Sequence, residues 1–164
     1  MSNKSTRYNI RYTQLKFSLL LFTLMLSSVT VSAKSNKHYL VIEHNIPSNK
    51  HDLEITSIGM LSLEKNLIGS ARLSYLESDK NGKGSTLDLG GGYVFRGDVS
   101  PYLLLGISLG YNWDKDDYIT AYYPELGIVI DFTKKFGITV SGKRYFNLYD
   151  EDENIVMLGL VFRN

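Results

Sequence analysis

The segment Tyr122-Tyr-Pro-Glu-Leu-Gly-Ile-Val-Ile-Asp-Phe132 decides the fold of this chain. The row that starts at Tyr122 and takes every second residue to Phe132 is apolar throughout, apart from one proline. The alternate row carries Glu125 and Asp131. Because successive side chains of a β-strand point to opposite faces, this segment is predicted to be a strand with one apolar face and one polar face.

The same alternation recurs along the chain, whereas helical periodicity is absent after residue 33. We expect eight strands, at 38–46, 53–64, 67–77, 86–96, 102–114, 118–132, 136–148 and 155–163. Turn-forming residues separate them. An apolar outside and a polar inside predict an all-β fold, an eight-stranded antiparallel up-and-down transmembrane β-barrel. In hydrocarbon every backbone group must be bonded within the protein, so the last strand should pair with the first.

The first 33 residues have the pattern of a secretory signal peptide. Four basic residues between positions 4 and 16 precede an apolar run at 17–26, and Val31-Ser-Ala33 offers a small-x-small cleavage site. The alternative is a membrane anchor, but the apolar run is shorter than the ~20 residues that a spanning helix needs. We therefore expect a signal peptide at 1–33 and one barrel domain at 34–164.

Composition excludes several classes of function. The mature part loses four of the 18 basic residues and none of the 17 acidic ones, so it is net negative and offers no basic surface for nucleic acid. The absence of cysteine excludes disulfides and thiolate metal sites. No glycine-rich phosphate loop or nucleophile elbow occurs. We expect a monomer without a cofactor.

An even number of strands puts both ends of the barrel domain on the periplasmic side. The connectors 47–52, 78–85, 115–117 and 149–154 should then face outward; on the whole they are longer and more charged than the other three. The aromatic residues sort into two rims in this topology, as amphipathic rings do at membrane interfaces. The predicted outer rim holds Tyr75, Tyr111, Trp113, Tyr118, Tyr122 and Phe146; the periplasmic rim holds Tyr93, Phe95, Phe132, Phe136 and Phe162. A soluble sandwich or lipocalin-like barrel, the alternative, has no reason to sort them.

The interior of an eight-stranded barrel is only wide enough for side chains. The predicted lumen network consists of Glu43, Glu54, Arg72, Asp88, Arg96, Glu125, Asp131 and Arg163. Acids and bases are mixed, so we expect ion pairs that plug the lumen. Arg144 falls on the lipid-facing row. A β-bulge near Gly142 would turn it inward, and snorkelling to the outer rim is the alternative.

Two groups of residues could carry chemistry. His44, His51, Ser48 and Glu43 lie close in sequence and could form a hydrolytic trio, but polar loop residues are common. The acidic groups Asp114/Asp116/Asp117 and Glu151/Asp152/Glu153 could bind divalent cations, with solvated loop acids as the favoured interpretation. We therefore expect no catalytic residue, no metal site and no enzyme activity.

The last two strands carry a family resemblance. The ending Asn154-Ile-Val-Met-Leu-Gly-Leu-Val-Phe-Arg-Asn164 resembles the C-terminal strand of bacterial outer-membrane proteins. The stretch Gly142-Lys-Arg-Tyr-Phe-Asn-Leu148 is similar to the penultimate strands of small eight-stranded barrels of the OmpX/Ail, OmpA-transmembrane and YfaZ-like types.

This resemblance implies a location in the cell outer membrane of a Gram-negative bacterium, among outer-membrane lipid and lipopolysaccharide. It also implies that Phe162 is the assembly signal read by the barrel-assembly machinery. We expect a structural or surface-interaction role with a plugged polar lumen. The alternatives are a narrow pore or carrier of small apolar molecules and, third, a lipid A-modifying enzyme.

Overall fold

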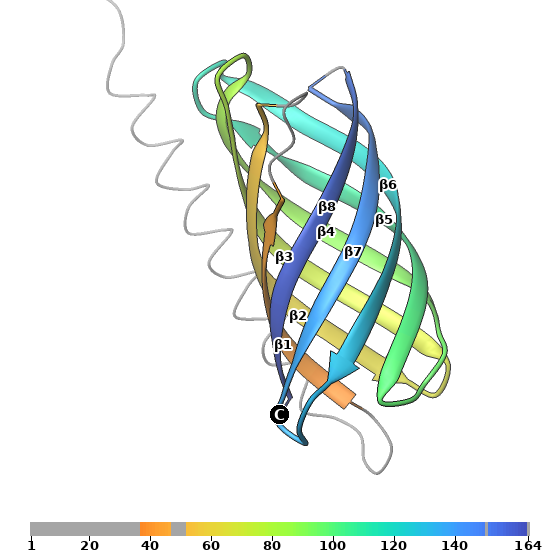
Figure 1. Cartoon of the computed structure of the whole chain (residues 1–164). Helices are drawn as coiled ribbons and strands as arrows, with labels where there is room; N and C mark the ends of the chain where they lie inside the picture. Colours follow the sequence, from red (N-terminus) through yellow and green to blue (C-terminus); the bar gives the residue numbers. More distant parts are fainter. Residues whose placement is uncertain (1–36, 47–51, 150, 164) are drawn as a thin grey trace, which may run out of the picture. The chain divides into compact units, whose positions relative to one another are not determined.

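The computed structural model describes residues 37–46, 52–149 and 151–163. The predicted signal peptide and its cleavage site lie outside this part of the chain. Across the described residues, eight antiparallel strands form a closed barrel, so the predicted fold class is confirmed (Figure 1). The strands are β1 (Lys37–Asn45), β2 (Glu54–Glu64), β3 (Leu67–Ser78), β4 (Gly82–Val94), β5 (Val99–Asn112), β6 (Asp117–Asp131), β7 (Phe136–Leu148) and β8 (Glu151–Arg163).

Each strand pairs with the next one in sequence, and β8 closes the barrel on β1. The closing ladder runs from Tyr39 opposite Arg163 to Asn45 opposite Met157, and Figure 1 shows the two strands side by side. The predicted pairing of the last strand with the first is therefore confirmed. In the described residues, no helix is long and apolar enough to cross a membrane.

Two strands begin four residues earlier than the sequence predicts. β4 begins at Gly82 rather than at 86, and β8 begins at Glu151 rather than at 155. These early residues are polar, which led us to assign them to loops, but they continue the ladders of their hairpins, as Ser78 opposite Gly82 shows. Polarity at this end of a strand indicates where the chain leaves the apolar belt, and the strand itself continues beyond it.

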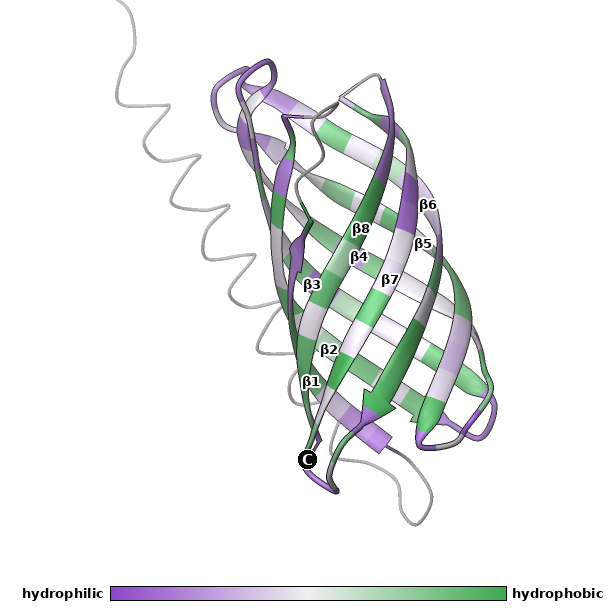
Figure 2. Ribbon diagram, viewed as in Figure 1, coloured by the Kyte–Doolittle hydropathy of each residue, from purple (hydrophilic) through white to green (hydrophobic). Residues whose placement is uncertain are grey.

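The connectors after β1, β3, β5 and β7 lie at one end, which we call the outer end from the predicted topology. The opposite end is called the periplasmic end. In Figure 2 hydrophilic residues gather at both ends, and hydrophobic residues alternate with polar ones along the strands. On β8, Val156, Leu158, Leu160 and Phe162 are exposed, while the residues between them are buried. The exterior therefore presents the predicted apolar belt.

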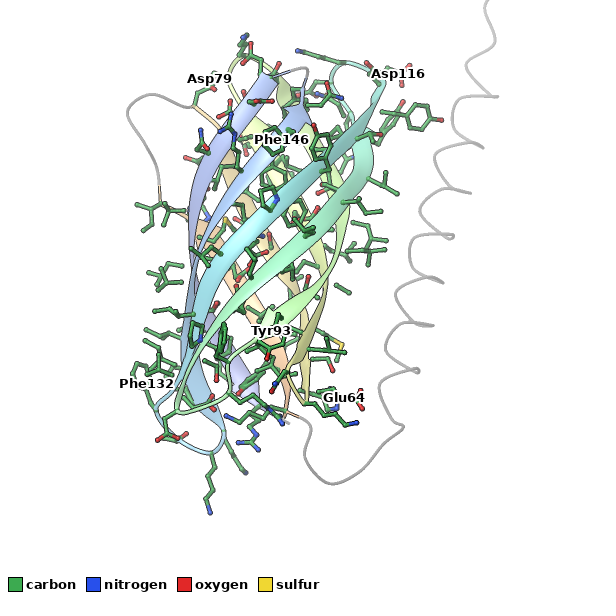
Figure 3. All side chains as sticks on the ribbon, turned by 90° about the vertical axis from the view of Figure 1, so that its right-hand side faces the viewer. Glu64, Asp79, Tyr93, Asp116, Phe132 and Phe146 are labelled. Atoms are coloured by element: carbon green, nitrogen blue, oxygen red, sulfur yellow. The ribbon has the colours of Figure 1, made fainter. Side chains whose placement is uncertain are left out.

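The two aromatic rims agree with the prediction. Three ring pairs lie in the predicted outer rim: Tyr75–Trp113, Tyr111–Tyr118 and Tyr122–Phe146. Three more lie in the predicted periplasmic rim: Tyr93–Phe95, Phe132–Phe136 and Phe136–Phe162. Figure 3 shows Phe146 toward the same end as Asp79 and Asp116, the outer end, and Tyr93 and Phe132 toward the periplasmic end. The apolar belt lies between the rims, as it does in barrels that sit in a bilayer.

The interior differs from the prediction, because many buried apolar residues fill it alongside the polar ones. Apolar residues point inward near both ends of the strands. Those near the periplasmic end are Tyr39, Val41, Leu61, Leu63, Ile68, Val94, Val129 and Val161; those near the outer end are Leu53, Ile55, Leu76, Ile119, Leu148 and Ile155. A lumen that is too narrow for bulk water is filled by packed side chains, so its ends gain from apolar burial as a soluble core does.

This layering explains a wrong prediction at Glu54. Leu53 and Ile55 are buried on the inward face of β2, so Glu54 points outward and is exposed at the outer end, opposite Glu77. The rule that apolar residues face lipid inverts there, because the apolar residues of this strand end fill the lumen.

Arg144 stays on the outward face of β7. The β7–β8 ladder is regular through Gly142, which lies opposite Val156, and its irregularity falls between Tyr145 and Leu148. A bulge near Gly142 is therefore wrong. The guanidinium is exposed and lies 3.4 Å from Asp152, as expected for a side chain that reaches to the outer rim.

Candidate functional site: the charged layer inside the barrel

Arg72 on β3 is the centre of a charged layer halfway along the lumen. Its Nη1 and Nη2 donate to the two carboxylate oxygens of Glu125 on β6, at 3.0 and 2.9 Å. Its Nε lies 2.9 Å from Oε2 of Glu43 on β1. All three side chains have 0% exposed surface. A bidentate pair of this kind fixes both distance and orientation, so the layer ties together three separate hairpins.

Lys143 completes the charged layer, and sequence analysis missed it. Its Nζ lies 3.9 Å from Glu43 and 3.8 Å from Glu125, and it sits 5.5 Å from the centre of the Tyr123 ring. The signal was available, because Lys143 shares a row with Thr139 and Ser141, opposite to the apolar row of Ile138 and Val140. The neighbouring Arg144 is the more conspicuous residue, because it is a cation on the apolar row.

Asp88 on β4 also belongs to the charged layer, and its hydrogen-bond donors are uncharged hydroxyl groups. Its carboxylate accepts hydrogen bonds from Ser74 at 2.6 Å, from Thr86 at 2.9 Å and from Ser108. Ser74 also lies 2.8 Å from the hydroxyl of Ser57 on β2. A buried carboxylate is costly unless it is paired or hydrogen-bonded, and here hydroxyl groups satisfy it.

Glycines make room for the large side chains of the charged layer. Gly59 lies opposite Arg72 on the neighbouring strand, and a Cβ there would come within 2.9 Å of Cγ of Arg72. The same relation holds in three more cross-strand pairs, which are Gly159 with Glu43, Gly127 with Tyr102 and Gly106 with Tyr123. The mid-strand glycines therefore serve close packing, and their pairing with inward-facing large residues is a signal that could have located the layer.

Apart from Glu54, the other predicted lumen residues lie at the periplasmic end and outside the charged layer. Asp131 lies 2.7 Å from Nζ of Lys37 and accepts a 3.0 Å hydrogen bond from the Tyr39 hydroxyl. Arg96 donates to the carbonyl of Leu63 at 3.2 Å. Arg163 is half-buried and lies opposite Tyr39 in the last residue pair of the β1–β8 ladder. Of the eight predicted residues, Glu43, Arg72, Asp88 and Glu125 meet in the charged layer.

A second polar network closes the outer end, and we call it the outer cap. It is centred on the β3–β4 turn at 79–81. Asp52 accepts hydrogen bonds from the Ser78 hydroxyl at 3.0 Å and from the Lys80 backbone N–H at 2.9 Å. Asn81 accepts from Asn112 at 2.7 Å through its carbonyl oxygen. The outer cap thus links the connectors after β1, β3 and β5.

Two groups of the outer cap titrate away from their ordinary values. The backbone N–H of Lys80 holds the pKa of the Asp52 carboxyl below its usual range, helped by the Ser78 hydroxyl. The Lys80 ammonium forms an ion pair with Glu151, which raises the pKa of that ammonium. Both groups lie in water, so solvent screens these interactions.

The predicted hydrolytic trio is not assembled among the described residues. His44 lies on the outward face of β1, with its Nδ1 2.9 Å from the Thr56 hydroxyl. Glu43 points the other way, into the charged layer. Ser48 and His51 lie outside the described residues. The two groups that the structure does place are therefore separated by the barrel wall.

The acidic groups of the outer end have separate partners. Asp114 accepts a hydrogen bond from the Lys83 backbone at 2.9 Å, Asp117 accepts one from the Tyr118 backbone at 2.7 Å, and Asp152 lies beside Arg144. In the described part of the chain, no group of three or more His, Asp or Glu side chains is arranged to hold a metal ion.

The charged layer lies across the middle of the lumen, and its buried polar side chains are consistent with a plugged lumen. A continuous ion path would have to pass a bidentate Arg72–Glu125 pair and then the apolar layers on either side of it. Breaking such a pair leaves a charge without a partner in a buried site, which costs several kcal/mol.

No family model and no curated protein matches the sequence. Solved structures do. The N-terminal β-barrel domain of Pseudomonas aeruginosa OprF matches with a TM-score of 0.58 and 19% identity over 79% of this chain and 96% of that one. The Yersinia pestis outer membrane protein Ail gives 0.53 and 18% over 79% and 100%. Neisserial surface protein A gives 0.53 and 13% over 81% and 97%.

The chain has the fold of a small outer-membrane β-barrel. At these identities the matches establish the fold alone. Together with the apolar belt and the two aromatic rims, they support an outer-membrane location.

Proposed function

We propose that this protein is a non-conducting barrel of the outer membrane, with a structural or surface-interaction role. The observation that carries the proposal is the fully buried contact of Arg72 with Glu125 and Glu43 across the middle of the lumen. A pore needs a hydrated path, and the apolar layers above and below these ion pairs oppose one.

The proposal excludes catalysis. Acid–base chemistry on a lipid needs a nucleophile and a base within hydrogen-bond reach of each other at the membrane surface. His44 faces outward beside Thr56, and Glu43 is held by Arg72 inside the barrel. The absence of a lipid A mass change when the protein is expressed would agree with this assignment, and a new lipid A species would contradict it.

The proposal keeps Phe162 as the residue that the barrel-assembly machinery reads. Its ring is exposed on the outward row of β8 and contacts Phe136. Phe162→Ala should lower the amount of folded barrel in outer membranes, whereas refolding of the purified variant into vesicles should change little. An equal loss in both assays would assign Phe162 to packing alone.

Planar-bilayer recording tests the plugged lumen. The wild-type barrel should give no stable current at any salt concentration, because the charged layer closes the path. The double variant Arg72→Ala/Glu125→Ala removes one charge of each sign, leaves Glu43 with Lys143 3.9 Å away as its partner, and should conduct more than wild type. Lys80→Ala in the outer cap serves as the control and should remain silent. A steady wild-type current that scales with salt would overturn the proposal and assign a narrow pore.

A further inference from the structure

The lipid-facing surface of β4, β5 and β6 contains a groove of about 760 Å³. This volume lies within the ~300–1,000 Å³ typical of ligand sites. The groove is apolar, and its walls come from outward-facing side chains of three adjacent strands. Its main wall residues are Leu89, Leu105, Ile107, Tyr122, Pro124 and Phe146.

Gly91, which carries no side chain, is one of the residues that line the groove. Gly91 lies opposite Leu105 in the β4–β5 ladder, on the outward row between Leu89 and Tyr93. A Cβ at this position would meet only the carbonyl oxygen of Ile68, 3.9 Å away. The barrel therefore has space for a side chain at Gly91 but carries none, which leaves a trough in an otherwise continuous apolar wall.

The groove runs obliquely toward the outer rim. Because the strands are tilted, the cross-strand row that contains Leu89 and Ile107 continues through Tyr122 to Phe146. Figure 3 shows Phe146 toward the outer end and Tyr93, two residues after Gly91, toward the periplasmic end. The groove thus begins in the outer aromatic rim and descends into the belt.

A cation lies at the outer end of the groove. The rings of Tyr122 and Phe146 stack with their centres 4.9 Å apart, and the guanidinium of Arg144 lies 4.9 Å from the centre of the Phe146 ring. This contact orients the guanidinium beside the groove. Its ion pair with Asp152 is exposed and 3.4 Å long, so it holds the cation only weakly.

We propose that the groove binds one acyl chain of lipid A, with a lipid A phosphate on Arg144. The groove supplies an apolar trough that opens at the outer rim, and Arg144 supplies the positive charge at the depth where a head group lies. Guanidinium groups bind phosphate through paired N–H donors. The proposal rests on the proposed outer-membrane location, and it predicts a bound lipid at a fixed place on the barrel wall.

Two other occupants fit the groove less well. A second copy of the barrel would have to insert a ridge into the trough and would leave Arg144 without an added anion. A phospholipid also offers a phosphate, but the head group of one in the periplasmic leaflet would lie far from Arg144, which contacts Phe146 in the outer rim. Native mass spectrometry distinguishes a second copy of the barrel and a bound phospholipid from bound lipid A.

Native mass spectrometry of the delipidated, purified barrel in mild detergent tests the proposal. Lipid A and phosphatidylglycerol are titrated separately at equal concentrations, and heat-dependent gel migration confirms that each variant is folded. Wild type should retain one lipid A and little phosphatidylglycerol. Gly91→Phe should fill the trough and lower lipid A retention about tenfold, which corresponds to the loss of roughly two buried methylene groups. Gly91→Ala, which leaves most of the trough open, is the matched control and should resemble wild type.

Charge variants test the head-group contact. Arg144→Gln should lower lipid A retention, Arg144→Lys should recover part of it, and Asp152→Asn should raise it by removing a competing anion. Equal retention by all variants, tighter binding of phosphatidylglycerol, or dimers in place of lipid adducts would each overturn the proposal. Bilayer recording of the same samples separates the two proposals, because a barrel that conducts and still retains lipid A would overturn only the plugged lumen.

Discussion

The charged layer and the outer cap are both polar networks that join distant strands, but they differ in what surrounds them. Arg72 and its two carboxylate partners have no exposed surface, whereas Lys80 and Glu151 in the outer cap are 63% and 49% exposed. Water can replace any partner that is lost from the outer cap. In the charged layer no water can replace a lost partner, so the loss of one contact costs more stability there than in the outer cap.

The largest expected effect is at Arg72. Arg72→Ala leaves two buried carboxylates, Glu43 and Glu125, with the single ammonium of Lys143 at 3.8–3.9 Å, and should lower the free energy of unfolding by about 3–5 kcal/mol. Urea unfolding of the barrel refolded into vesicles measures this change. Lys143→Met is the control within the charged layer, because Lys143 lies 3.8 Å or more from both carboxylates. Equal losses in the two variants would mean that total charge governs the layer and that the bidentate contact does not.

The next effect tests how closely the charged layer is packed. A Cβ at Gly106 would lie 2.4 Å from the Tyr123 ring, whereas one at the outward-facing Gly91 would lie 3.9 Å from its nearest neighbour. Gly106→Leu should therefore destabilise the barrel by about 1–3 kcal/mol through overpacking. Gly91→Leu should change stability by less than about 0.5 kcal/mol. Equal effects in the same urea assay would contradict the observed difference between the two faces.

The sequence predicts the wall of this barrel better than its interior. Along β6 and β8 the contrast between rows is strong, so parity assigned Glu125 and Phe162 to the correct faces. Near the ends of β2 it fails, because Ile55 and Leu63 fill the lumen while apolar residues also face lipid. Where both faces of a strand contact apolar surroundings, the alternation of residues does not indicate which face points into the lumen.

Which residues form the charged layer could be predicted only in part, and the reason differs from the one that applies to β2. Arg72 and Glu125 are 53 residues apart and meet across the lumen, so their pairing depends on strand tilt and register around the whole closed sheet. The parity of a residue predicts whether its side chain points into the lumen, but it does not predict how far along the barrel axis that side chain lies. It therefore placed Asp131 in the same network as Arg72, although Asp131 pairs with Lys37 at the periplasmic end.

A smaller effect is expected in the outer cap. Lys80→Ala removes the ion pair with Glu151 but leaves both positions in water. Exposed pairs of this kind contribute about 0–1 kcal/mol, so the urea midpoint should shift little. The shift should shrink further at high salt, since exposed charges are screened. A loss comparable with that of Arg72→Ala would show that the outer cap is as closed to water as the charged layer.

The smallest effect concerns the response of the outer cap to acid. The folded state holds the pKa of Asp52 below its ordinary value, mainly through the Lys80 backbone N–H. The contribution of this carboxylate to stability is therefore complete above the ordinary Asp pKa and is lost as the pH falls through the lower pKa of the folded state. Hydrogen exchange at the Lys80 amide, corrected for its intrinsic rate, should lose protection in that acid range, while the global unfolding free energy changes little. Asp52→Asn should give low protection at every pH, because an amide oxygen does not titrate and accepts a weaker hydrogen bond from the Lys80 N–H. Protection that persists in wild type below the acid range would mean that the β3–β4 turn is held by Asn81 and Asn112 alone, and the outer cap would then resemble the charged layer in its independence of water.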